Sequence, residues 1–214
     1  MGDIFQEVDE EVRRDRFNKF WKEYGGYVIA AAVAVVLGTS ASVGWREYSA
    51  KRQQEDSNRF AAAAAQASEG RQQEAAAAFQ ALSSEAQAGY ALLARFRAAD
   101  ALKEAGDTSG AIQTFEDIAA DSGVGKLYRE LASVLALMHQ IDDGDPEQLR
   151  ARLTPLLTPD GMWRHSAREL SGALALRTGD RELAKTEFQR LADDLEAPPG
   201  ARARAAETLQ ILGN

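Results

Sequence analysis

An uncharged run of 21 residues, Gly25–Trp45, constrains this chain more than any other feature of its sequence. As a helix it would extend roughly 31 Å, the thickness of the hydrocarbon core of a bilayer. Aromatic residues flank the run where interfacial aromatics are expected: Trp21, Tyr24 and Tyr27 before it, Trp45 and Tyr48 at its end. The sequence therefore predicts one membrane-spanning helix (25–45) between an acidic, amphipathic head (1–24) and a soluble region (46–214).

A cleavable signal peptide is the competing interpretation of the same run. Its apolar centre would be Val28–Leu37, and the small residues Thr39, Ser40 and Ala41 would suit a cleavage site. The head is long and acidic, however, whereas a signal peptide begins with a short basic segment. We therefore favour a retained span. Five Lys or Arg residues shortly before the run and four after it favour a cytoplasmic head only slightly.

Small residues recur at every fourth position within the run. This spacing places them on one helix face and would let the backbone of another membrane helix approach closely. In a segment so rich in alanine and glycine, composition alone would also produce such a pattern. The sequence thus provides a hypothetical membrane contact face, which consists of Gly26, Ala30, Ala34, Gly38 and Ser42.

The soluble region repeats a pattern of glycine, then alanine or leucine five residues later, then phenylalanine or leucine four residues beyond. The pattern occurs four times, and its glycines are 36, 38 and 35 residues apart. Its members are Gly70, Ala75 and Phe79; Gly106, Ala111 and Phe115; Gly144, Leu149 and Leu153; and Gly179, Ala184 and Phe188. A period of this length indicates a solenoid of stacked helix pairs.

Each position of the pattern has a physical role in a helix–turn–helix unit. The glycine would end the first helix in a left-handed cap, and Asp107, Asp145 or Asp180 would cap the second. The small residue would allow close packing, and the Phe or Leu one turn later would fill the space beside it. The residues seven positions before the glycines are Ala63, Ala99, Leu137 and Gly172, and three of these four are small.

We therefore expect an all-α fold with four helix pairs and a C-terminal capping helix. The expected pairs are 47–69 with 71–84, 87–105 with 107–121, 125–141 with 145–157, and 162–178 with 180–195. The cap is expected at Ala201–Leu212, after a break at Pro198, Pro199 and Gly200. The period and the Ala-x-x-x-Phe element resemble the tetratricopeptide repeat, from which the third copy departs through its two leucines. That resemblance implies surfaces that bind peptides, extended chains or other domains.

The composition leaves little material for catalysis. Cysteine is absent, and the two histidines, His139 and His165, lie in no arrangement with a nucleophile or base. The carboxylates of Asp142, Asp143 and Asp145 lack the spacing of an EF-hand loop. A formal charge of −8 argues against nucleic acid as a partner. We expect no enzyme activity, no cofactor and no metal site.

The segment FNKFWKEYGGYVIAAAVAVVLGTSASVGWREYSAKRQ carries a second resemblance. Its FW-K run, its Ala/Val/Gly-rich span and its exit through Gly44, Trp45 and Arg46 are similar to the start of the ancillary SecYEG translocon subunits, the YfgM-like family. The resemblance implies a single-span protein of the bacterial inner membrane, with a cytoplasmic N-terminus and a periplasmic tetratricopeptide-like domain. It implies as partners the SecYEG channel, a PpiD-type periplasmic chaperone and newly exported, unfolded proteins.

Three functional hypotheses follow from these patterns. The leading one is a membrane-anchored, non-enzymatic adaptor at the Sec translocon that binds periplasmic chaperones or exported chains. The alternative is a self-assembling structural protein of envelope biogenesis, a homo-oligomer formed through the small-residue face and the repeat surfaces. An envelope enzyme is the third, and the two unpaired histidines give it the least support.

Overall fold

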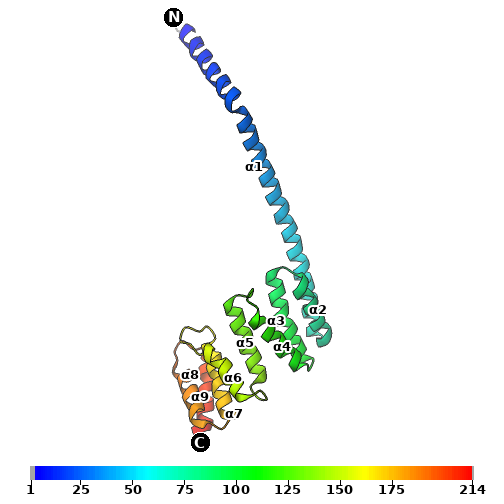
Figure 1. Cartoon of the computed structure of the whole chain (residues 1–214), viewed down its shortest axis with the longest axis vertical. Coiled ribbons are helices and arrows are strands. Elements are labelled where there is room, and N and C mark those ends of the chain that lie inside the picture. The colour runs from blue at the N-terminus through cyan, green and yellow to red at the C-terminus, as the bar shows by residue number, and fades with distance from the viewer. Residues whose placement is uncertain (1–2, 214) are drawn as a thin grey trace. The chain divides into compact units, whose positions relative to one another are not determined.

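The structure is a computed structural model that describes the backbone of residues 3–213 (Figure 1). The side chains of residues 3–12, 15, 20, 31 and 88 lie outside the described set, so the amphipathic pattern expected in the head falls mostly beyond it. Every element of regular structure in the described part is helical, which confirms the all-α prediction. The chain divides into two units, Met1–Glu55 and Asp56–Asn214.

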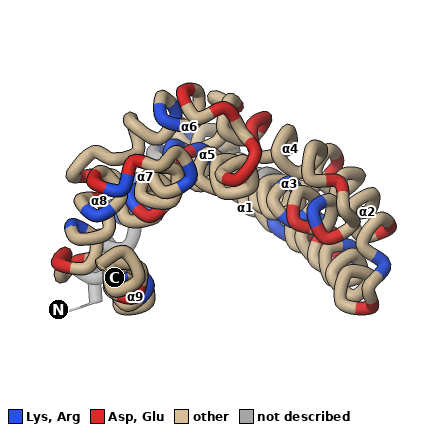
Figure 2. The backbone as a smooth tube through the Cα atoms, turned by 90° about the horizontal axis from the view of Figure 1, so that it is seen from below, with Lys and Arg blue, Asp and Glu red and all other residues tan. Residues whose placement is uncertain are grey.

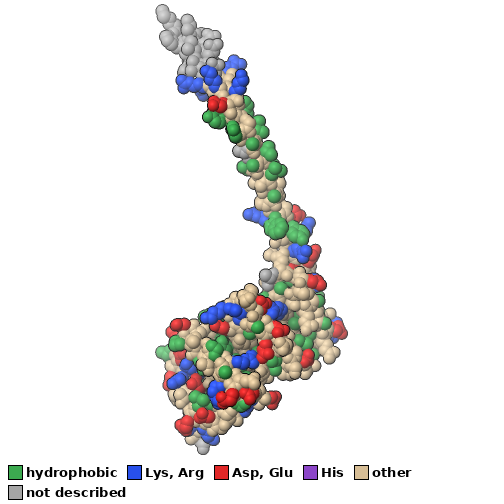
Figure 3. All heavy atoms as spheres, in the orientation of Figure 1, with side chains coloured by type: hydrophobic (Ala, Val, Ile, Leu, Met, Phe, Trp, Pro, Cys, Tyr) green, Lys and Arg blue, Asp and Glu red, His purple; other side chains and the backbone are tan. Residues whose placement is uncertain are grey.

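A single long helix, α1 (Asp3–Ser68), makes up the described part of the first unit and supplies the first helix of the second. Green apolar side chains show on the described part of this helix in Figure 3. Among the described side chains of the first unit, the large apolar ones are exposed, including Val28, Val35 and Leu37. Among the described helices, α1 is the one long and apolar enough to cross a membrane. Membrane anchors and N-terminal signal sequences share this composition, and the bounds 25–45 remain a prediction.

The second unit is an array of helix pairs in which each helix packs on the next. The arc in Figure 2 has α3, α5 and α7 on its inner side and α2, α4, α6 and α8 on its outer side. The helices are α2 (Gln72–Glu85), α3 (Ala88–Glu104), α4 (Thr108–Ala120), α5 (Lys126–Gln140), α6 (Pro146–Leu153), α7 (Arg164–Arg177), α8 (Arg181–Asp193) and α9 (Pro199–Gly213).

Prolines account for two of the differences from the expected helix bounds, including the largest one. The helix α6 ends at Leu153 and continues as one 3₁₀ turn, Thr154–Leu156, because Pro155 has no amide hydrogen to donate to an α-helical bond. The expected range 145–157 was therefore too long. The capping helix α9 begins at Pro199, two residues before the expected start, because proline is well suited to the first position of a helix.

The hydrophobic core is divided among the helix pairs. Four clusters of buried side chains contain Phe79, Phe115, Leu153 and Phe188 respectively, one from each copy of the repeat pattern. A solenoid is expected to have such a distributed core, because each pair contacts only its neighbours.

Since successive helices are antiparallel, the array has two distinct edges. The turn edge consists of the turns within pairs: 69–71, 105–107, 141–145 and 178–180. The loop edge consists of the connections between pairs: 86–87, 121–125, 157–163 and 194–198. The chain enters the array at the loop edge, where the buried carboxylate of Asp56 accepts a hydrogen bond from the Gln87 amide at 3.0 Å.

Candidate protein-interaction surface

Three of the four repeat glycines end the first helix of their pair in the left-handed conformation. Gly70, Gly106 and Gly179 have φ values of 81°, 89° and 81°. After the second pair's first helix, the Asp107 amide donates to the Leu102 carbonyl at 2.9 Å, which satisfies one of the free carbonyls at a helix end. The same pattern recurs at the other two glycines. These glycines therefore set the tight reversal of each pair.

The third turn is built differently, and the left-handed cap expected at Gly144 is wrong. This glycine has no positive φ, yet a Cβ there would lie 2.8 Å from the Gln140 carbonyl oxygen. The Arg177 guanidinium, from the following pair, donates to the carbonyls of Ile141 at 2.7 Å and Gly144 at 2.6 Å. The Gly144 amide still donates to the Gln140 carbonyl at 2.8 Å, and the side chain of the next repeat satisfies two further carbonyls of this turn.

Aspartates cap the second helix of three pairs. The side chains of Asp107, Asp145 and Asp180 accept hydrogen bonds from the amide three residues later, at 2.8, 2.9 and 3.0 Å. The first pair has Arg71 at this position, with no side-chain cap. Arg71 instead pairs with Glu69 and Glu74, which raise the pKa of its guanidinium.

The repeat-defining side chains lie inside the array and not on its surface. Each is 5% exposed or less: Ala75, Phe79, Ala111, Phe115, Leu149, Leu153, Ala184 and Phe188. At Gly172 a Cβ would lie 2.8 Å from the Phe188 ring, so the absence of a side chain there lets the ring pack against the backbone. These residues build the scaffold, and a binding surface must come from other positions.

Arginine and acidic residues form a second periodic feature, which the sequence patterns above did not include. An arginine stands eleven residues before the glycine of the first, second and fourth copies, and an acidic residue stands fifteen after it. Arg59 pairs with Glu85 at 2.8 Å, and Arg95 with Asp121 at 2.7 Å. The hydrogen bond from Arg95 is the main cause that lowers the pKa of Asp121. The spacing of eleven and fifteen was the signal that would have revealed these pairs.

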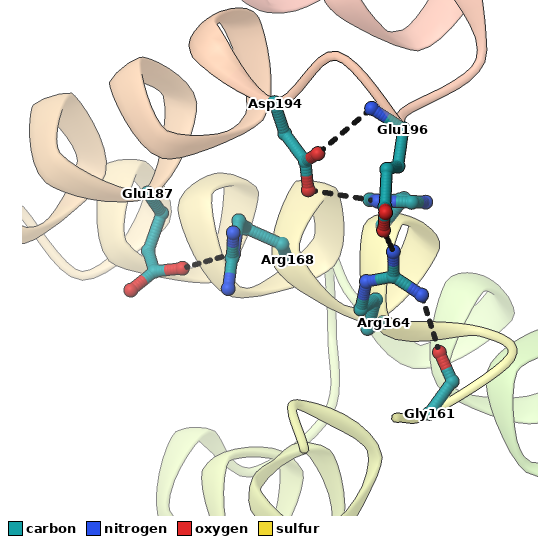
Figure 4. Close-up of polar contacts among 7 residues, drawn as sticks. Gly161, Arg164, Arg168, Glu187, Asp194 and Glu196 are labelled. Carbon is teal, nitrogen blue, oxygen red and sulfur yellow. Dashed lines mark hydrogen bonds and ion pairs between the residues drawn. The ribbon is translucent and has the colours of Figure 1, made fainter. Parts of the chain in front are cut away.

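In the fourth copy these positions take different partners (Figure 4). Asp194 accepts from the Glu196 amide at 2.9 Å and lies 3.0 Å from His165 Nε2, and both contacts lower its pKa, the amide most. Arg168 lies 3.5 Å from the buried carboxylate of Glu187. Each charge is matched by a neighbour, so this cluster holds the loop before α9 against α7. The cluster therefore has a structural role.

Aromatic residues also recur at a fixed position, sixteen residues before the last three glycines, as Tyr90, Tyr128 and Trp163. The Tyr90 ring lies 6.0 Å from the ring of Phe60, and Trp163 Nε1 donates to the Leu127 carbonyl at 3.0 Å. Tyr90 and Trp163 therefore contact the first helix of the preceding pair. They join successive repeats near the loop edge.

A hollow of about 240 Å³ lies between α1, α2 and α3. Asp100 and Glu104 line it, together with Arg97, whose guanidinium lies 5.9 Å from the centre of the Phe79 ring. Partial burial is the main cause that raises the pKa of Asp100, although Arg97 lies 3.6 Å away. The Asp100 side chain is nevertheless 52% exposed, so its carboxylate can be reached by a partner.

Exposed apolar side chains extend this surface along the inner helices. Leu93 is exposed on α3 and lies seven residues before Asp100. Residues seven apart share a helix face, so the two side chains lie on the same side of α3. Met138 is exposed on α5, six residues before Gly144, just as Asp100 stands six before Gly106. Leu93, Asp100 and Met138 therefore define a candidate inner surface that is apolar and acidic.

His139 is the residue after Met138 and so lies next to this surface. Its ring stacks 5.8 Å from the ring of Phe115, and burial is the main cause that lowers its pKa. No group of three or more His, Asp or Glu side chains in the described part could hold a metal ion. Neither histidine lies in a nucleophile–base arrangement among the contacts described.

The small-residue face of α1 stays a hypothesis. A Cβ added at Gly26 or Gly38 would meet no atom within 4 Å, and Ala30, Ala34 and Ser42 are exposed. The Ser42 hydroxyl donates to the Thr39 carbonyl at 3.1 Å, so its polar group is satisfied within the helix. The face offers room for a second helix.

These features define an array of paired helices with a scaffold of repeated glycines, small residues and phenylalanines. Residues 18–209 match the tetratricopeptide repeat-like domain family, and the chain belongs to that family. No curated protein and no solved structure matches the sequence. Domains of this kind bind proteins, which agrees with an inner surface that carries exposed side chains.

Proposed function

We propose that this protein is a membrane-anchored, non-enzymatic adaptor whose helix-pair array binds protein partners. The observation that carries the proposal is one chain that joins an exposed, apolar N-terminal helix to a tetratricopeptide repeat-like array. Exposed apolar side chains along α1 are unfavourable in water, and insertion into a bilayer would cover them.

The resemblance of residues 17–48 to the YfgM-like family supports a more specific role. In this role the head lies in the cytoplasm of a bacterium, α1 spans the inner membrane and the array works in the periplasm. The partners are the SecYEG channel, a PpiD-type chaperone and newly exported, unfolded chains. The small-residue face of α1 would contact the channel or a second copy of the chain.

The inner surface is the proposed contact for the soluble partner. Leu93 and Met138 offer apolar area, and Asp100 offers a carboxylate for a cationic group of the partner. Apolar side chains that become fully covered on binding contribute most of the binding energy in many interfaces, and an exposed carboxylate beside them adds selectivity for a cationic partner.

Site-directed photocrosslinking in the native membrane tests this role. A crosslinker at Leu93 or Met138 should capture the chaperone or an exported chain, while one at Ala34 should capture a channel subunit. Gln113, exposed on the outer helix α4, is the matched control and should capture neither. Crosslinks from Leu93 and Ala34 to a second copy alone would favour the self-assembling structural protein. Co-purification that returned neither channel nor chaperone would count against the Sec role.

The variant Asp100→Asn tests whether the Asp100 carboxylate contributes to partner binding without contributing to folding stability. Burial raises the pKa of Asp100 in the folded chain, so its charged form is disfavoured there. This group contributes stability below its unfolded pKa and loses it as pH rises through the folded pKa, so the neutral amide should keep or raise stability at pH 7. Chaperone capture at Met138 should fall in the same variant. An unchanged capture yield would remove Asp100 from the binding surface.

A further inference from the structure

Exposed large apolar side chains gather at the loop edge of the array. Seven such side chains are described in the second unit: Met162 and Leu195 lie within the connections of this edge, and Leu127 and Tyr128 lie two and three residues after the connection 121–125, at the start of α5. Met162 is 70% exposed and Leu195 is 86% exposed. Within the described turns of the opposite edge there is none, although Met138 lies three residues before the turn 141–145 and Ile211 lies near the far end of α9. Scattered single apolar residues need no explanation, but a gathering at one edge does.

Hydrogen bonds and ion pairs hold these side chains in one region. The bond from Trp163 Nε1 to the Leu127 carbonyl, 3.0 Å long, brings the start of α7 beside the start of α5. Arg164, two residues after Met162, forms an ion pair at 2.5 Å with Glu196, the residue that follows Leu195 (Figure 4). This ion pair joins the loop that carries Leu195 to the start of α7. The loop edge therefore presents its apolar side chains from fixed backbone positions.

The first unit joins the array at this same edge. The buried carboxylate of Asp56 bonds the Gln87 amide in the first connection of the loop edge, and the uncharged run ends at Trp45. The ten intervening residues span at most about 35 Å when extended and about 16 Å as the helix observed here. If the run spans a bilayer, the attachment point of the loop edge stays close to the lipid surface at any angle of α1.

We infer that the loop edge docks on the lipid interface through Tyr128, Met162 and Leu195, with α1 as its tether. The inference rests on the membrane anchor of the proposed function. The basic side chains at or near this edge act on carboxylates: Arg59, Arg95, Lys126 and Arg164 are each in an ion pair, and Arg129 acts electrostatically on Asp121. We therefore attribute the contact to apolar insertion and not to attraction to anionic lipid. A short tether makes even a weak contact effective, because the local concentration of its target is high.

Such docking fixes the array against the membrane. The inner surface with Leu93 and Met138 would then be held near the membrane, within reach of a chain that leaves a membrane channel. Specificity for that chain would come from the inner surface, whereas the loop edge would set its distance from the lipid.

Fluorescence quenching in vesicles tests the docking, and the absence of native cysteine makes the labelling simple. Met162→Cys and Leu195→Cys in the full chain would each carry an environment-sensitive NBD label. Ser109→Cys, exposed beside the turn edge at the start of α4, is the matched control. In phosphatidylcholine vesicles with nitroxide on shallow acyl positions, the first two labels should lose most of their fluorescence, at low and high salt alike. The control label should lose little.

Flotation of the same vesicles after an alkaline wash tests the membrane anchor separately from the docking of the loop edge. If the chain floats and all three labels are quenched alike, the docking is overturned and the anchor stands. If the chain does not float, both are overturned. Labels at positions 162 and 195 that shift to the blue without nitroxide quenching would show that a second copy covers the edge, which also overturns docking on lipid. Leu195→Asp should reduce quenching at position 162 toward the control value.

Discussion

The second and third helix pairs of the array reach equal burial with different side chains. In the second pair, Ala99 and Phe115 belong to one buried cluster. In the third, Leu137 and Leu153 take the corresponding positions in another, and both are at most 1% exposed. The small Ala99 and the large Phe115 of the second pair thus correspond to two leucines in the third pair. The second and third pairs therefore bury different combinations of side chains at this contact, and a close-packed core allows this when the neighbouring residues adjust.

The largest expected effect comes from converting the third pair to the pattern of the second. Leu137→Ala removes a buried side chain and should cost about 2–5 kcal/mol in unfolding free energy. Leu153→Phe alone should overpack the cluster and cost about 1–3 kcal/mol. Because the new ring can occupy the space left by Leu137, the double variant should recover part of the loss. Urea unfolding of the full chain in detergent, followed by ellipticity, measures all three.

A matched cycle in the second pair sharpens this result. Ala99→Leu with Phe115→Leu should also couple favourably, by roughly 0.5–3 kcal/mol relative to the sum of the single changes. Strict additivity in both pairs would contradict the exchange of volume between the two positions.

The next effect concerns the fourth pair, where the small position is a glycine. Gly172→Ala places a Cβ 2.8 Å from the Phe188 ring and should destabilise the array by about 1–3 kcal/mol. Gly89→Ala in α3, where a Cβ meets no atom within 4 Å, should stabilise the helix slightly. Thermal unfolding of both variants checks the contrast. Equal stabilisation by the two changes would show that the ring moves freely at the fourth pair.

A smaller effect distinguishes the first pair from the rest. Asp180→Ala removes the side-chain cap of α8 and should cost about 1 kcal/mol, because one amide at the helix start loses its partner. Arg71→Ala in the first pair removes no such cap and should cost less, since its ion pairs are exposed. Denaturant midpoints of the two variants provide the comparison. A larger loss at Arg71 would mean that exposed pairs matter more than caps here.

The smallest expected effect is a pH dependence of stability that comes from Asp121 in the second pair. The third pair has a proline at the corresponding position and no carboxylate there. Hydrogen bonds from Arg95 and the Gly123 amide hold the pKa of Asp121 below its usual value. The folded chain therefore binds this proton less readily than the unfolded chain, and the associated stability is present above about pH 4 and is lost as pH falls through the folded pKa. Asp121→Asn should flatten the stability profile in that acid window.

Pro159, at the corresponding position of the third pair, provides the control for that profile. Its replacement by Ala should leave the acid slope unchanged, since no carboxylate is lost. If Asp121→Asn also leaves the slope unchanged, other carboxylates govern acid unfolding.

Local patterns were sufficient to predict most of the scaffold. The helix pairs and their buried Ala and Phe positions follow from a period that is visible along the chain, because residues four apart share a helix face. The bounds of α6 and α9 were missed by a few residues, since the roles of Pro155 and Pro199 depend on where each falls within its helix. At Gly144, the same residue type that reverses the other pairs serves a different turn, because Arg177 from the next repeat satisfies the carbonyls there.

The candidate surfaces were harder to predict than the scaffold. Asp100, Leu93 and Met138 carry no sequence signal beyond their repeat position, and their importance comes from their exposure in the folded array. The loop edge likewise combines side chains from connections far apart in sequence. Their proximity depends on the pairs Arg164–Glu196 and His165–Asp194, which join residues 32 and 29 positions apart.

The sequence by itself determined that this chain is helical, that its array repeats with a period near 36, and that one uncharged run of 21 residues precedes the array. These properties depend on short-range periodicity and composition, which the chain carries locally. Only the tertiary structure decided which side chains remain exposed on the inner surface and at the loop edge, and how the third turn is closed. Such outcomes depend on contacts between residues about 30 positions apart, and those contacts exist only after the pairs have stacked.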